Sequence, residues 1–169
     1  MNKLTTASVI RRSKVIIVFT AALFGLTTLT NNLTDYAAYA DFIGRVLSMN
    51  DTEGNDSRRY RAITSNIFHH RFYWAIISLE IIYTFSCLVG TYQLCRKIDA
   101  PRNEFHESKK FAIAGLVTGI FVYQALYIII LNEWFDMDYS AHRNTYDWAE
   151  NNIAYMFLGL IYLTAVKDS

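Results

Sequence analysis

Glu80 is the residue whose chemical type is least expected at its position, because it is the single acidic or basic side chain inside the four apolar blocks at 15–29, 72–94, 111–131 and 153–166. Counted from Tyr73 along a helix, it lies roughly 10 Å into the membrane at about 1.5 Å per residue. Hydrocarbon disfavours a charged carboxylate, so Glu80 is expected to be neutral unless water or a cation reaches it. Placing an ionisable side chain in the membrane costs free energy, and two hypotheses explain why Glu80 is there. It forms a hydrogen-bonded structural contact, or it is a site for a proton, an ion or a ligand.

Gln124 is the predicted partner of Glu80, because it lies about equally deep on another apolar block when counted back from Leu131. Thr28 and Tyr155 are alternative partners on two further blocks. Small and polar residues recur near these positions at spacings of three and four, which predicts helix–helix contacts. The glycines predicted to pack at such contacts are Gly25, Gly115, Gly119 and Gly159. The third block thus contains a Gly-x-x-x-Gly pair, which serves either folding or self-association.

The sequence gives little support for haem binding, thiol redox chemistry or metal binding. The apolar blocks contain no histidine that could bind a membrane haem, and the two cysteines do not form a Cys-x-x-Cys motif. The side chains that could form an outer metal site are His69, His70, His142, Glu133, Asp136 and Asp138. Adjacent histidines point in different directions on a helix, so at most one of the pair would bind a metal easily. We therefore predict no catalytic residue, no metal and no cofactor, and we do not expect an enzyme.

The four apolar blocks predict an all-α membrane protein, a four-transmembrane-helix bundle in which residues 1–169 form a single integral membrane domain. A span needs about 20 residues to cross about 30 Å of hydrocarbon. The predicted spans are residues 15–33, 72–94, 111–131 and 149–166, with outer loops at 34–71 and 132–148. An Ala-x-Ala triplet at 38–40 lies too far past the first block for a signal-peptide cleavage site, so we expect this block to be retained.

The distribution of lysine and arginine predicts that both the N- and C-termini are cytoplasmic. In this orientation ten basic residues fall in inner segments and six fall in outer loops, although Arg71 opposes the trend. The net charge of +1 gives no general attraction to nucleic acid. The expected partners are the lipid bilayer and either other membrane-protein subunits or a second copy of the chain.

The first outer loop is too long for a simple connection and predicts short amphipathic helices. One apolar stripe has the spacing i, i+3, i+4, i+7 and i+8 of a helix face. It consists of Tyr39, Phe42, Ile43, Val46 and Leu47. A second, weaker stripe consists of Tyr60, Ile63, Ile67 and Phe68. We expect both helices to lie on the membrane surface or to cap the bundle.

Four short segments and two single residues carry a resemblance to a known family. The segments are 31–36 (Asn-Asn-Leu-Thr-Asp-Tyr), 46–49 (Val-Leu-Ser-Met), 61–63 (Arg-Ala-Ile) and 133–135 (Glu-Trp-Phe). Together with Tyr73 and Glu80, they resemble DUF2165, a family of bacterial predicted small integral membrane proteins. The resemblance covers nearly the whole chain. It implies a four-span protein of the bacterial inner membrane and no particular activity.

The matching segments lie mostly on the predicted outer side and define a candidate binding cluster near Glu80. Its members are Glu80, Gln124, Asn31, Asn32, Asp35, Glu133 and Trp134. The first hypothesis is a non-enzymatic accessory or structural subunit of a membrane complex, with a filled bundle, a satisfied Glu80 and exposed small-residue faces at Gly115 and Gly119. The alternative is a small transporter or ligand-binding protein, in which Glu80 faces an outward cavity.

Overall fold

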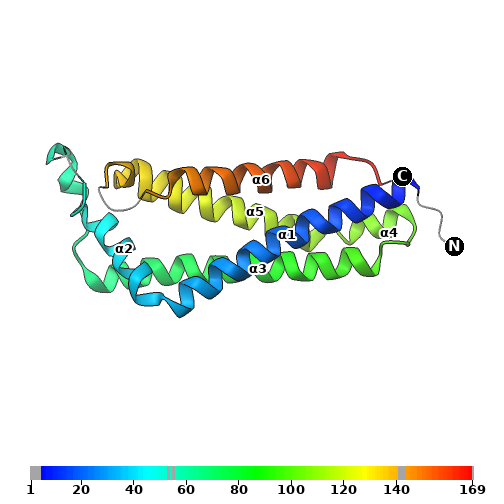
Figure 1. Cartoon of the computed structure of the whole chain (residues 1–169), viewed down its shortest axis with the longest axis horizontal. Helices are drawn as coiled ribbons and strands as arrows, with labels where there is room; N and C mark the ends of the chain where they lie inside the picture. The colour runs from blue at the N-terminus through cyan, green and yellow to red at the C-terminus, as the bar shows by residue number, and fades with distance from the viewer. Residues whose placement is uncertain (1–4, 53, 55, 141–143, 169) are drawn as a thin grey trace.

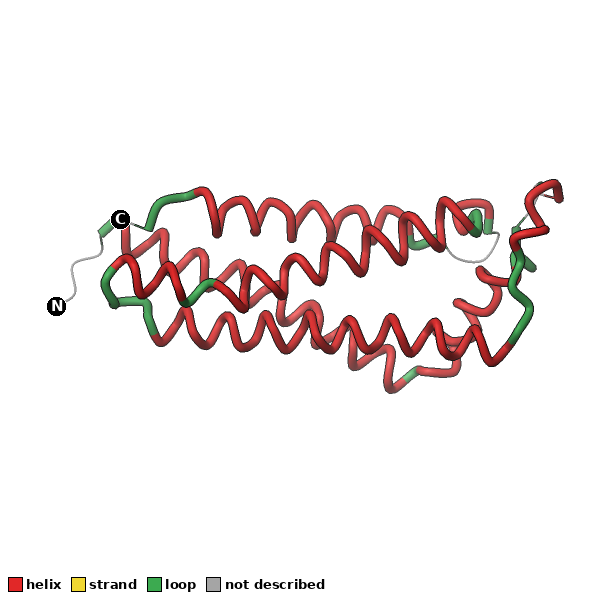
Figure 2. Tube along the Cα trace, turned by 180° about the vertical axis from the view of Figure 1, so that it is seen from behind, coloured by secondary structure: helices red, strands yellow, loops and turns green. Residues whose placement is uncertain are grey.

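The computed structural model describes residues 5–52, 54, 56–140 and 144–168, and its described part is helical without strands. The long helices are α1 (Thr6–Thr34), α3 (Asn66–Arg96), α5 (Lys110–Phe121) continued by η2 (Val122–Trp134), and α6 (Tyr146–Ala165). The short elements are α2 (Tyr36–Ser48), η1 (Asp56–Arg61), α4 (Arg102–Glu107) and η3 (Met137–Tyr139). Figure 2 shows the helices running side by side, with the loops gathered at the two ends of the bundle.

Side-chain caps fix the beginnings of two long helices. The Thr5 hydroxyl accepts a hydrogen bond from the Ser8 amide at the start of α1, and the Ser65 hydroxyl accepts one from Phe68 at the start of α3. Each cap satisfies an amide that has no partner within its helix. Because α3 begins at Asn66, it starts six residues before the predicted span at 72–94 and includes Ile67 and Phe68.

The helices form an elongated bundle in which α3 packs against both α1 and α5, and α6 packs against α5 and η2. The start of α1 and the end of α6 lie at one end of the bundle, whereas α2 and η1 lie at the other (Figure 1). We call these the inner end and the outer end. Helix α1 crosses the bundle diagonally: it contacts α6 near the inner end, through Ile17 and Gly159, and diverges from it towards the outer end.

Within the described part of the chain, three helices are long and apolar enough to cross a membrane, namely 6–34, 66–96 and 102–134. Helix α6 is not among them; it has 20 residues and carries Asp147 and Glu150 in its first two turns. Many large apolar side chains on the outside of the bundle are exposed, among them Ile16 on α1, Ile82 on α3 and Leu158 on α6. Exposed apolar surface of this extent is expected where helices face lipid.

The glycines predicted to pack lie at contacts between helices, so the backbones approach closely. A Cβ atom at Gly115 would lie 2.8 Å from the backbone nitrogen of Cys87, and one at Gly119 would meet Tyr83 and Met156. The Gly-x-x-x-Gly pair is therefore buried inside this chain, and the exposed small-residue face expected for an accessory subunit is not formed. Gly90, which the sequence patterns did not single out, packs equally closely against Ala112.

Helix η2 differs from an α-helix because its hydrogen bonds span five residues, as in the bond from the Phe135 amide to the Ile130 carbonyl. This π-helical geometry is rare and is often found near functional sites. Tyr123 and Tyr127 of this helix face into the bundle, whereas Gln124 is exposed. The two tyrosines follow Gly119 by four and eight residues, so the inward face of α5 continues into η2.

The first outer loop contains α2, whose Ile43, Val46 and Leu47 are buried and whose Tyr39 and Phe42 pack against the core. The prediction of a second amphipathic helix was wrong. Residues 56–61 form the 3₁₀ helix η1, residues 62–65 are irregular, and the last two apolar positions of the stripe belong to α3. Four apolar residues over nine positions did not provide enough buried surface for a separate helix.

The two outer loops contact each other. Arg58 forms an ion pair with the buried Asp136 at 2.6 Å. The guanidinium of Arg61 lies 4.5 Å from the ring centroid of Trp134, and Thr52 forms an isolated antiparallel bridge with Ser140. These contacts connect segments far apart in the sequence and make the outer end one unit.

Replacing Arg58 with alanine is expected to loosen the second outer loop, because it leaves the carboxylate of Asp136 buried without its cation. Hydrogen–deuterium exchange should become faster at the amides of Tyr139 and Ser140, which donate to the carbonyls of Asp136 and Met137. Arg45→Ala is the matched control, since Arg45 pairs with Asp41 on α2 and both side chains are exposed. Equal exchange rates in the two variants would contradict the role assigned to Arg58.

Candidate functional site

Glu80 and Asn32 form the centre of the candidate site. Glu80 is completely buried on α3, and its Oε2 atom accepts a hydrogen bond of 2.5 Å from the Asn32 side-chain amide on α1. The Asn32 backbone carbonyl accepts a second hydrogen bond, of 3.1 Å, from the Tyr73 hydroxyl. Spacing along α3 explains this arrangement, because Tyr73, Glu80 and Thr84 are separated by seven and four residues and lie on one face.

Tyrosines enclose this pair on its inner side. Tyr83, on α3, donates a hydrogen bond to the Ala21 carbonyl of α1. Tyr123, on η2, is also completely buried, and its hydroxyl has no hydrogen-bond partner among the described residues. Glu80 Oε1 has no hydrogen-bond partner among the residues that the structure describes. The carboxyl group thus keeps one oxygen available in a polar region enclosed by helices.

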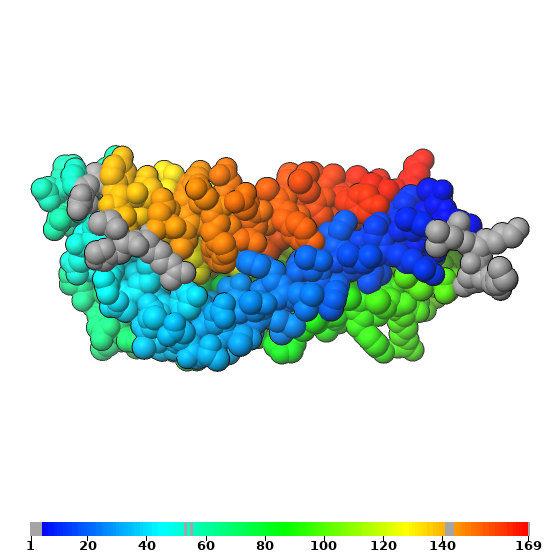
Figure 3. Space-filling model, in the orientation of Figure 1, coloured from blue at the N-terminus to red at the C-terminus, as the bar shows by residue number. Residues whose placement is uncertain are grey.

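A cavity of about 420 Å³ lies between the outer halves of the helices, where α1 diverges from α6. Its polar lining comes from Thr27, Thr28, Asn31, Asn32, Tyr73, Asn144 and Thr145, and its apolar lining from Phe24, Tyr39, Phe42, Ile43, Tyr127 and Trp148. In Figure 3 residues of η2 are visible between α1 and α6 on this face of the molecule. The volume falls within the usual range for small-molecule pockets, about 300–1,000 Å³.

Trp148 holds one wall of the cavity in place. From the first turn of α6, its ring contacts Phe24 of α1 at 5.8 Å and Tyr127 of η2 at 5.6 Å between centroids. It also meets Tyr123 edge-on at 5.2 Å. Such tilted and edge-on arrangements are favourable for aromatic pairs. This cluster therefore joins the start of α6 to η2 and, through Phe24, to α1 beside the cavity.

The structure brings together only part of the predicted cluster. Asn32 is bonded to Glu80, and Asn31 lies beside it in the cavity lining. The prediction of a Glu80–Gln124 hydrogen bond was wrong, because Gln124 is exposed on the outside of the bundle. Its neighbour Tyr123, one α-helical turn after Gly119, takes the inward position.

The remaining predicted members lie apart from the cavity. Asp35 is exposed in the turn between α1 and α2, and Glu133 is exposed at the end of η2, where it accepts a hydrogen bond of 3.3 Å from Asn132. Trp134 packs on Arg61 in the contact between the outer loops. These residues belong to the outer end and do not line the cavity.

The alternative of an outer metal site gains no support from the described residues, which contain no group of three suitable ligands. The His69 ring instead bonds the Ile63 carbonyl at 2.5 Å, and the His70 ring bonds the Tyr36 hydroxyl at 2.8 Å. His142 lies outside the described residues. His69 and His70 thus both take part in contacts within the first outer loop.

Several cavity residues were missed by the sequence analysis. Tyr73 served only as the reference for the depth of Glu80 and as a residue that matches the family, and Trp148 was not singled out among the aromatic residues that usually lie near the ends of spans. Tyr73 could have been found from its spacing of seven residues to Glu80, which places both on one face of a helix. No local signal distinguishes Trp148 from an ordinary anchor.

Comparison with known proteins identifies one related family. The model of the family described as "Predicted small integral membrane protein (DUF2165)" matches residues 10–165. The match includes every described residue of the cavity and of the Glu80–Asn32 pair. No curated protein and no solved structure matches the chain.

Proposed function

Since this chain belongs to the DUF2165 family of predicted small integral membrane proteins, we propose that it is a non-enzymatic membrane protein that binds a small ligand in its outer cavity. The observation that carries this proposal is the position of Asn32. Its side chain lines the cavity and donates a hydrogen bond to the buried Glu80. Glu80 is thus a positioning residue, which orients the amide that meets the ligand.

The lining indicates the chemical class of the ligand. The described lining residues carry amide, hydroxyl, aromatic and aliphatic groups, and none of them carries a formal charge. Aromatic walls favour a flat or apolar body, whereas a few convergent amides and hydroxyls orient polar groups. We therefore favour an uncharged amphipathic molecule that enters from the outer leaflet or from the outer aqueous phase.

The accessory-subunit hypothesis receives less support from the same observations. It predicted a filled bundle, a fully satisfied Glu80 and an exposed face at Gly115 and Gly119. Instead, the outer half holds a cavity, Glu80 Oε1 has no partner among the described residues, and both glycines are buried. Co-purification of a stoichiometric second subunit in mild detergent would favour the accessory role.

A substitution that fills the cavity tests ligand binding. Native mass spectrometry of the protein released from mild detergent is expected to show a bound small molecule in the wild type and none in Thr28→Trp, because the indole occupies the cavity. Thr20→Trp is the matched control, since Thr20 is exposed on the same helix. Equal occupancy in both variants, or no bound molecule in the wild type, would refute the proposal.

The proposal places the chain in the bacterial inner membrane with four spans and both ends cytoplasmic. Reporter fusions at positions 55 and 169 are expected to give an outside and an inside signal, respectively, because the basic residues are enriched at the inner end. An outside signal from position 169 would mean that α6 does not cross the membrane.

A further inference from the structure

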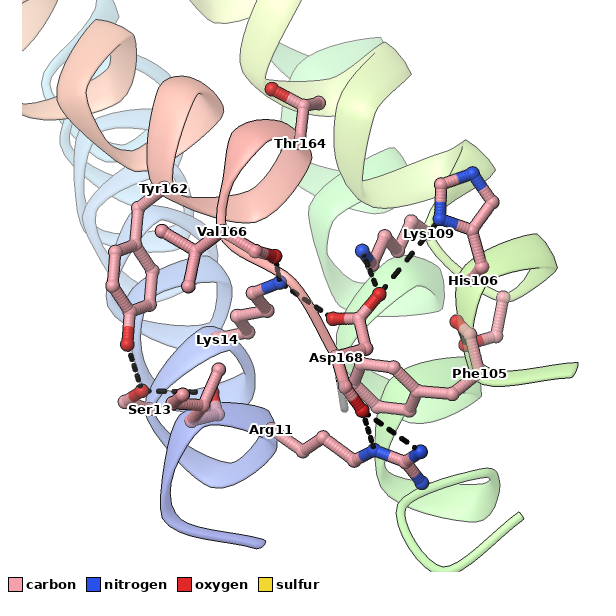
Figure 4. Close-up of polar contacts among 12 residues, drawn as sticks. Arg11, Ser13, Lys14, Phe105, His106, Lys109, Tyr162, Thr164, Val166 and Asp168 are labelled. Atoms are coloured by element: carbon pink, nitrogen blue, oxygen red, sulfur yellow. Dashed lines mark hydrogen bonds and ion pairs between the residues drawn. The ribbon is translucent and has the colours of Figure 1, made fainter. Parts of the chain in front are cut away.

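A cluster of basic side chains surrounds the segment that follows α6 at the inner end (Figure 4). Lys14 of α1 and Lys109, beside the start of α5, donate to the two carboxylate oxygens of Asp168 at 2.6 and 2.5 Å. Lys14 also donates to the Val166 carbonyl at 2.5 Å, and Arg11 makes two bonds of 3.1 Å to the Asp168 carbonyl. We call Arg11, Lys14 and Lys109 the inner cationic site.

The inner cationic site is built into the fold. The side chains of Lys14 and Lys109 are 0% and 2% exposed, which is unusual for lysine. Arg11 is held by the carbonyls of Ile98 and Ala100 and lies 4.9 Å from the Phe105 ring centroid. These contacts come from elements other than the segment after α6, so they can position the Arg11 guanidinium without that segment.

The charges around Asp168 are not balanced. The Asp168 carboxylate accepts hydrogen bonds from two ammonium groups, and His106 lies 3.8 Å from it. The Arg11 guanidinium beside them is bonded to the Asp168 backbone carbonyl. Burial disfavours the charged carboxylate, but hydrogen bonds from Lys109 and Lys14 outweigh this effect, so the pKa of Asp168 lies below its ordinary value. The site therefore binds an anion and keeps an excess of positive charge while it does so.

The segment that supplies this anion is held mainly by the site itself. Val166 ends α6 in an extended conformation. Within the described part of the chain, the hydrogen bonds to residues 166–168 come from Arg11, Lys14 and Lys109. An anion that satisfied these three side chains could replace the segment without disturbing a helix.

We propose that the inner cationic site binds the phosphate group of an anionic ligand, and that residues 166–168 are its exchangeable intramolecular occupant. A phosphate offers several oxygens to the two ammonium groups and the guanidinium, and such charge-assisted hydrogen bonds are the strongest that these groups form. Lys14 and Lys109 border the predicted spans 15–33 and 111–131, at the depth where lipid headgroups lie. The shared chemistry fits an anionic phospholipid or a soluble phosphate.

A spin label on the exposed position 167 reports whether the segment is docked or released. The experiment uses full-length Lys167→Cys in a Cys95→Ser background, reconstituted in phosphatidylcholine nanodiscs. If the anion binds the form with the released segment ten times more tightly than the form with the docked segment, the ratio of released to docked label is expected to rise about tenfold. A rise with phosphatidylglycerol in the discs identifies a lipid headgroup, and a rise with inorganic phosphate in phosphatidylcholine discs identifies a soluble ligand.

Two neighbouring lysines provide a matched pair of variants. Lys109→Gln is expected to weaken the response to the anion, whereas Lys110→Gln is not, because Lys110 is exposed. If Lys109→Gln does not fold, Asp168→Asn replaces it and is expected to release the label in phosphatidylcholine alone. Any one of three results would overturn the proposal. The label could stay docked with both anions, the two lysine variants could respond equally, or the label could stay docked in Asp168→Asn.

Discussion

Gly115→Leu is expected to prevent the bundle from forming, or to lower its stability by about 3 kcal/mol or more. The cause is the contact between α5 and α3. A Cβ at this position would lie 2.8 Å from the nitrogen and 3.2 Å from the Cα of Cys87. These are backbone atoms of a packed helix, so the two helices would have to separate. Thermal unfolding in detergent, followed by size-exclusion chromatography, measures the effect.

Ala114→Leu is the control for this substitution, because the neighbouring Ala114 is exposed on the outside of the same helix. It adds the same side chain to the lipid-facing side and should leave the unfolding temperature nearly unchanged. If Gly115→Leu were as stable as Ala114→Leu, the close contact between α3 and α5 would be wrong, and the pair at 115 and 119 would again be available for self-association.

Glu80→Leu is expected to destabilise the protein by about 1–3 kcal/mol, because it leaves the amide of Asn32 buried without its acceptor. Glu80→Gln keeps an oxygen at the same position and is expected to retain most of the stability. It should also retain the bound molecule seen by native mass spectrometry, since the role of Glu80 in the cavity is to orient Asn32. Unfolding and ligand occupancy are measured on the same samples.

The glutamine variant separates the two hypotheses for Glu80. A stable Glu80→Gln protein that had lost its ligand would show that the ionisable carboxyl group itself takes part in binding or proton transfer. A leucine variant as stable as the wild type would instead mean that the Asn32 contact contributes little to the bundle.

Only part of the site was predictable from the sequence. Glu80 was selected as the ionisable residue in apolar surroundings and Asn32 from a segment that resembles the family, and the structure pairs them. Gln124 was selected from its depth, which the rise per residue fixes. Its rotation about the helix axis, about 140° from Gly119 in an α-helix, places it on the outside of the bundle, and Tyr123 takes the inward position.

The inner cationic site was missed for a different reason. Lys14 and Lys109 were interpreted only as basic residues that set the orientation in the membrane, which is their usual meaning near the ends of spans. Their pairing with Asp168 spans 154 and 59 residues. Periodicity relates residues within one helix, so it provides no information about ion pairs between distant segments.

The ion pair between Lys14 and Asp168 also sets an order of events during synthesis. The ribosome makes Lys14 154 residues before Asp168, which corresponds to roughly 8–30 s at about 5–20 residues per second. During that time α1 can enter the membrane, but its lysine has no carboxylate partner from residues 166–168. A chain that stalls before this segment would therefore carry an uncompensated positive charge at the inner end.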